Sequence, residues 1–182
     1  VVHNGIIENS DQIKKDLEAK GLKFKSQTDT EVITLLITEA LKDNEPLESV
    51  FKTLKNLKGS FALGIIFKDF KDIIIGARRG SPLAVGYSNK ENYLGSDSYA
   101  LKAMTNKISY LDDGDLCVLS KDKVEFYDLN KKKINKKVHI LSEDKNISDK
   151  GDYKNFMSKE RFEQSKTVKN CVNEYVDSLK KD

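Results

Sequence analysis

The feature that most constrains this chain is a block of helical patterns followed by a block of short strand-like patterns. Apolar residues recur at helical spacing in three segments, covering residues 10–20, 28–41 and 46–57. From residue 60 onward, short β-rich or apolar runs alternate with turn residues. Helices followed by strands predict separate helical and sheet layers, an α+β fold, rather than the alternating βαβ units of a parallel sheet.

The helical segments carry signals for where they begin and end. Ser10 suits the N-cap of the first helix, and Gly21 lies where a C′ glycine belongs. Thr28-Asp29-Thr30-Glu31 has capping-box spacing before the second helix, which is apolar on most of its circumference and is therefore expected to be deeply buried. Pro46 suits the first turn of the third helix.

The strand-like runs are short and separated by turn residues. They cover residues 1–7, 60–67, 72–77, 83–86, 92–95, 107–110, 115–119, 124–127 and 134–141, with a short helix predicted over 97–104. Residues 142–151 are polar, without a core pattern, and predict a linker. Residues 152–179 then predict a peripheral helical arm. We therefore expect one domain over 1–141 and a linker with a helical arm over 142–182.

The charge balance and the cysteine content exclude several classes of protein. Lys and Arg total 32 and Asp and Glu total 29, so a net charge of +3 does not indicate a nucleic acid or a membrane surface as partner. No apolar run approaches the length of a membrane-spanning helix. Two cysteines, Cys117 and Cys171, exclude a disulfide scaffold and fit a reducing compartment, so we expect a cytoplasmic protein.

The familiar signatures of metal and phosphate chemistry are not matched, and we expect neither a metal nor another cofactor. His3 and His139 lie far apart and outside any cluster with ligand spacing. Cys117 lies in an alternating apolar stretch, which predicts a packed core thiol, and Cys171 has no obvious base near it in sequence. Gly59 and the residues after it have the spacing of a phosphate loop without its Lys and Ser/Thr.

The His3-Asn4-Gly5 motif has two interpretations. Asn and Gly tolerate left-handed backbone, so the motif could simply be a tight turn that leaves a strand. Alternatively, the side-chain amide of Asn4 and the backbone N–H of Gly5 point at one spot. Two such neutral donors suit an acyl-transfer site, where negative charge develops on a carbonyl oxygen.

The Thr28–Glu31 motif also has two interpretations. It could be only a helix start, in which Thr28 and Glu31 cap the helix and Asp29 complements its dipole. Alternatively, Asp29 lies at the mouth of a cleft and binds a cation such as a substrate ammonium group. The second interpretation is favoured only by the presence of both motifs in one chain.

Several segments together resemble the glutamine–fructose-6-phosphate aminotransferases. The resemblance covers nearly the whole chain, and Ser165 departs from it where the family usually has Pro. The matching segments are Val1–Asn9, Thr28–Val32, Ala77–Leu83, Ser96–Leu101, Tyr110–Asp115 and Gly151–Gln164.

The resemblance implies the glutaminase part of such an enzyme. Its fold would be a class II glutamine amidotransferase domain of the N-terminal-nucleophile hydrolase type, a four-layer αββα sandwich truncated at its N-terminus. Asn4 and Gly5 would form the oxyanion hole, and Asp29 would bind the α-amino group of L-glutamine. The resemblance implies no role for Arg78 or Arg79, which we expect to be solvated or structural.

The resemblance also implies that the catalytic machinery is divided. In the family an N-terminal Cys attacks glutamine, and the released ammonia reaches a sugar-isomerase half that aminates fructose-6-phosphate. Because Val1 starts inside a strand and Asp182 follows no stop signal, we expect a fragment without nucleophile or sugar site, inactive alone. The whole enzyme would be a homo-oligomer. Two alternatives stay open: an amidotransferase with another ammonia acceptor, and a non-catalytic fragment that binds a ligand or partner.

Overall fold

The computed structural model describes residues 1–141 and 151–179. The chain divides into two compact units, Val1–Ser142 and Glu143–Asp182, and each is considered by itself. Across the described ranges, no helix combines the length and the apolar character that crossing a membrane requires. The predicted linker over 142–151 falls almost entirely outside the described residues.

Three helices follow the first strand, as the apolar spacing predicts. They are α1 (Ser10–Ala19), α2 (Asp29–Ala40) and α3 (Pro46–Asn56). Pro46 occupies the first turn of α3 as expected, whereas Ser10 is the first residue of α1 and Asn9 is its N-cap. Val32, Ile33 and Ile37 bury one face of α2, while its other apolar residues are only partly buried, so the burial is less complete than predicted.

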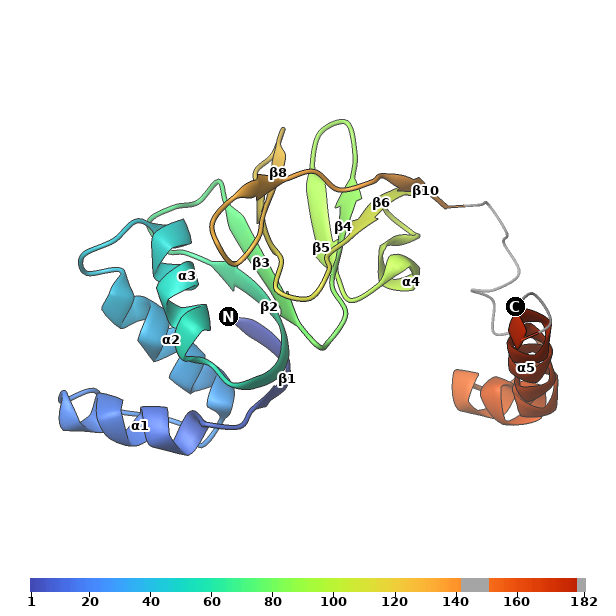
Figure 1. The fold of residues 1–182 in the computed structure, drawn as a ribbon, viewed down its shortest axis with the longest axis horizontal. Coiled ribbons are helices and arrows are strands. Elements are labelled where there is room, and N and C mark those ends of the chain that lie inside the picture. Colours follow the sequence, from blue (N-terminus) through green and yellow to red (C-terminus); the bar gives the residue numbers. More distant parts are fainter. Residues whose placement is uncertain (142–150, 180–182) are drawn as a thin grey trace. The chain divides into compact units, whose positions relative to one another are not determined.

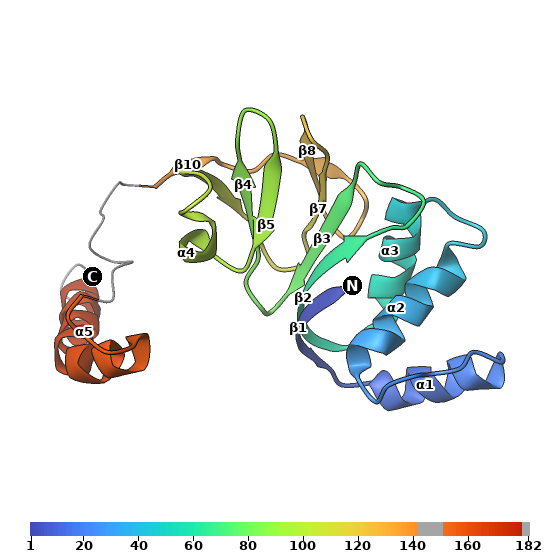
Figure 2. The same ribbon diagram turned by 180° about the vertical axis from the view of Figure 1, so that it is seen from behind.

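The strands form two antiparallel sheets (Figures 1 and 2). One has six strands in the order β1 (Val2–Ile7), β2 (Gly59–Ile66), β3 (Ile74–Arg79), β7 (Leu116–Leu119), β8 (Val124–Tyr127) and β9 (Lys133–Ile134). The other has four strands in the order β10 (His139–Ile140), β6 (Lys107–Tyr110), β4 (Ala84–Tyr87) and β5 (Asn92–Gly95).

The core shows that these elements stack in αββα order. Alternate residues of β2 serve two interfaces: Phe61 and Leu63 pack with the helices, and Ala62 packs toward the second sheet. A third apolar cluster joins the second sheet to the short helix α4 (Ser98–Leu101). Helices α1, α2 and α3 lie on one side of the two sheets, and α4 lies on the other side (Figure 1). This arrangement confirms the predicted fold class.

The predicted strand over 134–141 is wrong, because two short strands in different sheets replace it. β9 pairs with β8 in the first sheet, and β10 pairs with β6 in the second. The segment between them crosses from one sheet to the other. Lys136 holds this crossing, since its Nζ lies 2.6 Å from Oδ2 of Asp112 and also contacts the buried carboxylate of Asp115. Hydropathy alternation cannot reveal such a change of sheet.

Two other elements of the first unit differ from the prediction by two or more residues at one or both ends. The helix predicted over 97–104 is limited to α4, because the N–H groups of Met104 and Thr105 both bond to the carbonyl of Leu101 and close the helix with a turn. The strand predicted over 72–77 is shifted to Ile74–Arg79, because Arg78 and Arg79 still pair with β2.

The second unit is described mainly by one helix, α5 (Phe156–Leu179). This agrees with the helical arm predicted from the sequence. Tyr153 stacks on Phe162, with ring centroids 5.8 Å apart.

Candidate functional site

The Asn-Gly motif lies within β1, at an edge of the six-stranded sheet. Asn4 pairs with Ala62 and Gly5 pairs with Phe61, and the ladder with β2 continues to Ile7. Among the described non-glycine residues only Lys131 has a positive φ, so Asn4 has ordinary strand backbone. The interpretation of this motif as a tight turn is therefore wrong.

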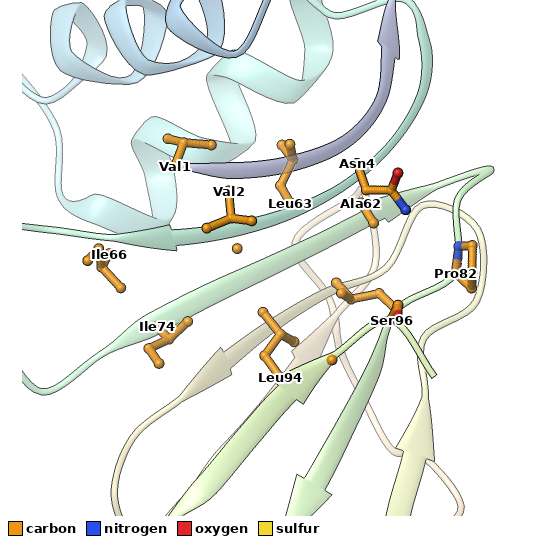
Figure 3. Close-up of a pocket in the computed structure, with 13 residues that line it drawn as sticks. Val1, Val2, Asn4, Ala62, Leu63, Ile66, Ile74, Pro82, Leu94 and Ser96 are labelled. Carbon is orange, nitrogen blue, oxygen red and sulfur yellow. The ribbon is translucent and has the colours of Figure 1, made fainter. Parts of the chain in front are cut away.

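Asn4 lines an open cavity of about 400 Å³ between the first three strands and the second sheet (Figure 3). Figure 3 shows its side chain on the cavity side of β1, close to Ala62. Asn4 and Ser96 are the polar side chains of an otherwise apolar lining. Its amide thus stands at a concave, largely apolar surface, which is the usual setting for a substrate-binding group.

Gly5 approaches the neighbouring strand too closely for any other residue. Its φ is +140°, and a Cβ placed on it would lie 2.0 Å from the carbonyl oxygen of Ser60 and 2.8 Å from Cα of Phe61. Both contacts are with backbone atoms, which cannot move aside without disturbing β2. Glycine at this position is therefore required by strand pairing, independently of any catalytic role.

Asp29 is the first residue of α2 and bonds directly to β1. Its Oδ2 accepts the backbone N–H of Ile7 at 2.9 Å, and its side chain is 27% exposed. The structure thus brings the acid to the strand that carries Asn4 and Gly5. Asp29 does not line the apolar cavity, and its carboxylate lies instead beside the start of the helix.

The predicted capping box at the start of α2 does not form. Thr28 is the N-cap, but its side chain makes no capping hydrogen bond. Glu31 turns to the preceding loop, where it accepts the N–H of Lys25 at 2.7 Å and the N–H and hydroxyl of Ser26 at 2.6 Å each. The Ser26 hydroxyl and the Lys25 amide lower the pKa of Glu31 below its ordinary value.

His3, which has no metal-ligand spacing in the sequence, lies in the structure beside the acid at the start of α2. Its side chain is 2% exposed, with Nδ1 lying 3.4 Å from Oδ1 of Asp29 and 3.2 Å from Oγ1 of Thr30. The signal that could have indicated this is the period of two in β1, which turns His3 and Asn4 to opposite faces. In the described part of the chain, no group of three or more His, Cys, Asp or Glu could hold a metal ion.

Arg78 and Arg79 are structural residues. The guanidinium group of Arg78 donates to the carbonyl oxygen of Leu111. The guanidinium group of Arg79 donates to the carbonyl oxygen of Leu57 at 2.7 Å and lies 5.1 Å from the ring centroid of Phe61. Both guanidinium groups therefore make contacts that fit a structural role.

Cys117 is a packed core thiol, as predicted. It is fully buried, and burial raises its pKa to about 12. A thiol held in this protonated and inaccessible form is a poor nucleophile. Cys171 is exposed and belongs to the other unit.

Comparisons with known proteins converge on one family. A family model described as "Glutamine amidotransferase domain" matches residues 1–103. The glutamine–fructose-6-phosphate aminotransferase [isomerizing] of Zymomonas mobilis is 45% identical over 177 residues, 97% of this chain and 29% of that protein. The Gluconobacter oxydans protein of the same name is 41% identical over the whole chain and 30% of its own length. The chain thus spans less than a third of these curated relatives.

Two solved structures share the fold at lower identity. Glutamine phosphoribosylpyrophosphate amidotransferase from B. subtilis, complexed with ADP and GMP, superimposes with a TM-score of 0.60 and 26% identity, covering 70% of this chain and 28% of that one. A structure titled as the allosteric regulatory enzyme of purine biosynthesis has a TM-score of 0.59 and 25% identity, covering 70% and 27% of the two chains.

Proposed function

Because the chain belongs to the glutamine amidotransferase domain family, we propose that it forms the glutaminase part of a glutamine–fructose-6-phosphate aminotransferase. Residues 1–141 would belong to the domain that releases ammonia from L-glutamine, and residues 142–182 would lead toward a sugar-isomerase half. The product of the whole cytoplasmic, homo-oligomeric enzyme would be glucosamine-6-phosphate, with glutamate as the second product. The chain is more than 40% identical to two such enzymes and only 26% identical to the solved phosphoribosylpyrophosphate amidotransferase. This difference supports fructose-6-phosphate over phosphoribosylpyrophosphate as the ammonia acceptor.

The observation that supports the glutamine site most directly is the hydrogen bond between Ile7 and Asp29. This 2.9 Å bond ties the acidic residue of one motif to a position two residues beyond Gly5 of the other. A negative charge that can receive the α-ammonium group thus lies next to the strand with the oxyanion donors. Taken alone, neither motif distinguishes an amidotransferase site from an ordinary structural feature, which would be a helix start for one motif and a strand for the other.

The pairing of β1 with β2 supports Gly5 as the second oxyanion donor. Glu8 donates its N–H to the carbonyl of Lys58, the residue just before β2, and the N–H of Ile7 points the other way, to Asp29. In an antiparallel ladder this orientation alternates along the strand. The same alternation directs the N–H of Gly5 to the open edge of β1, where substrate could reach it.

In this proposal, Asn4 and Gly5 stabilise the negative charge of the reaction intermediate, and Asp29 orients the substrate. When a thiolate attacks the glutamine carboxamide, its carbonyl oxygen becomes negatively charged, and the Asn4 amide and Gly5 N–H would donate hydrogen bonds to that oxygen. Asp29 would hold the α-ammonium group and so place the carboxamide against these donors. The nucleophile that the resemblance implies is an N-terminal Cys, and the fully buried Cys117, whose pKa is raised to about 12, is unsuited to that role.

The full-length protein tests the proposed reaction. With glutamine and fructose-6-phosphate, we expect glutamate and glucosamine-6-phosphate to appear in equal amounts. Glutamate without an aminated sugar phosphate would instead indicate an amidotransferase with another ammonia acceptor. Release of neither product would favour the alternative of a non-catalytic binding fragment.

Asp29→Asn in the full-length protein is expected to raise the KM for glutamine by about 10-fold to 100-fold, because a hydrogen bond to a charged group contributes about 1.5–3 kcal/mol. The asparagine oxygen can still accept the Ile7 N–H, so the fold should be retained. Steady-state kinetics with glutamine and with free ammonia provide the measurement, and any activity with ammonia should survive.

Glu31→Gln is the matched control for Asp29→Asn. It removes one negative charge from the same turn of α2, but the Glu31 carboxylate is occupied by the loop residues Lys25 and Ser26. We expect it to alter stability while leaving the KM for glutamine close to the parental value. Equal KM values for the two variants would exclude a specific role of Asp29 in binding the ammonium group.

A further inference from the structure

His3 connects the strand of the oxyanion motif to the acid at the start of α2. The Nδ1 atom of its buried ring lies 3.4 Å from Oδ1 of Asp29. The other carboxylate oxygen, Oδ2, accepts the N–H of Ile7 at 2.9 Å. Both oxygens of Asp29 are therefore approached from β1, one by a backbone donor and one by the imidazole ring.

The contacts of the ring distinguish its two nitrogens. The approach of Nδ1 to Oδ1 of Asp29 is an electrostatic contact, and it is attractive when Nδ1 carries the hydrogen, because an ionised carboxylate only accepts hydrogen bonds. Nδ1 also lies 3.2 Å from Oγ1 of Thr30, whereas the buried Nε2 has no hydrogen-bond partner among the described residues. An apolar side chain in this space would avoid the unpaired Nε2. What histidine adds here is the donor at Nδ1.

We propose that His3 is a positioning residue for glutamine, whose Nδ1–H orients the Asp29 carboxylate toward the α-ammonium group. This inference rests on the proposed binding role of Asp29. The side chain of His3 is only 2% exposed, so it acts through the acid rather than by touching the substrate. Its removal should therefore weaken the recognition of one part of glutamine, the amino group, and leave the carboxamide chemistry in place.

A substrate analogue separates this role from a general effect on the fold. In the full-length protein, His3→Leu is expected to raise the KM for glutamine by about fivefold to tenfold with little change in kcat. The inhibition constant of 4-carbamoylbutanoate, which is glutamine without the α-amino group, should stay at its parental value. An equal weakening of both ligands would overturn the proposal, because it would show that His3 supports the whole site.

Two conservative variants test the specific nitrogen. The amide nitrogen of Asn can occupy the position of Nδ1, whereas that of Gln reaches the position of Nε2. We therefore expect His3→Asn to restore the parental KM for glutamine and His3→Gln to resemble His3→Leu. Equal KM values for the Asn and Gln variants would overturn the proposal. This comparison stays decisive if His3→Leu fails to fold.

The double variant His3→Leu/Asp29→Asn separates the failure of this inference from the failure of the proposed site. If His3 acts only through Asp29, the double variant should have the KM of Asp29→Asn alone. A further rise in the double variant would overturn the positioning role. An increase in KM for Asp29→Asn but not for His3→Leu would remove the inference and leave the proposed function. An unchanged KM in Asp29→Asn would remove both.

Discussion

Asn4→Ala in the full-length protein is expected to retain its fold and to lose about 10²–10³ in kcat for glutamine hydrolysis. In the proposed role, the amide that is removed would stabilise the tetrahedral intermediate, so ground-state binding and KM should change little. Alanine suits the site because Asn4 has ordinary strand backbone and an exposed side chain. Gly5 would still supply its N–H, so some activity should persist. The thermal midpoint, kcat and KM together provide the measurement.

Asn9→Ala is the matched control, because it makes the same chemical change where the amide is structural. Nδ2 of Asn9 donates to the carbonyl of Asn56 at 2.8 Å, and its Oδ1 accepts the N–H of Lys58 at 2.9 Å. Losing these bonds should cost about 1–2 kcal/mol of stability and leave kcat unchanged. A fully active Asn4→Ala enzyme would exclude an oxyanion role for Asn4 and leave it only a structural role in β1.

Gly5→Ala is expected to destabilise the protein by about 3 kcal/mol or more, or to prevent folding. The added Cβ would lie 2.0 Å from the carbonyl oxygen of Ser60, and the φ of +140° is strained for any residue with a side chain. Relief requires β1 and β2 to separate, which would also displace Asn4. The midpoint of denaturant unfolding measures the loss.

Gly21→Ala separates the two causes of this destabilisation. Gly21 also has a positive φ, +87°, but nothing lies within 4 Å of the position of its Cβ. The backbone strain alone should cost about 1–2 kcal/mol. If Gly5→Ala were no less stable than Gly21→Ala, the close approach of β1 and β2 would not limit the residue at position 5.

Local patterns predicted most of the fold. The first three helices begin and end close to their predicted positions, because apolar spacing and residues such as Pro46 act within a few positions of one another. The strands over 107–110 and 124–127 match the prediction residue for residue. The αββα order of the layers is implied by the resemblance rather than by local patterns, and the structure gives its physical reason: β2 is apolar on both faces and is covered on both sides.

The errors occur where contacts between distant residues decide the outcome. Residues 134–141 read as one strand, but partners in β8 and β6 divide them between two sheets. Glu31 has the spacing to cap its own helix, yet the amides of Lys25 and Ser26 compete successfully for its carboxylate. The Asn-Gly pair suits a turn, but pairing with β2 extends the strand through it.

The candidate site divides in the same way. Asn4, Gly5 and Asp29 could be selected from the sequence, because an amide, a glycine and a carboxylate have suitable chemistry wherever they lie. The patterns of the sequence therefore determined most of the elements and these three candidates, and the resemblance supplied the order of the layers. Only the tertiary structure decided that Ser60 excludes a side chain at Gly5, that Ile7 binds Asp29 and that His3 faces this acid. Each of these contacts joins residues more than 20 positions apart, and their distances depend on how β1 packs against β2 and α2.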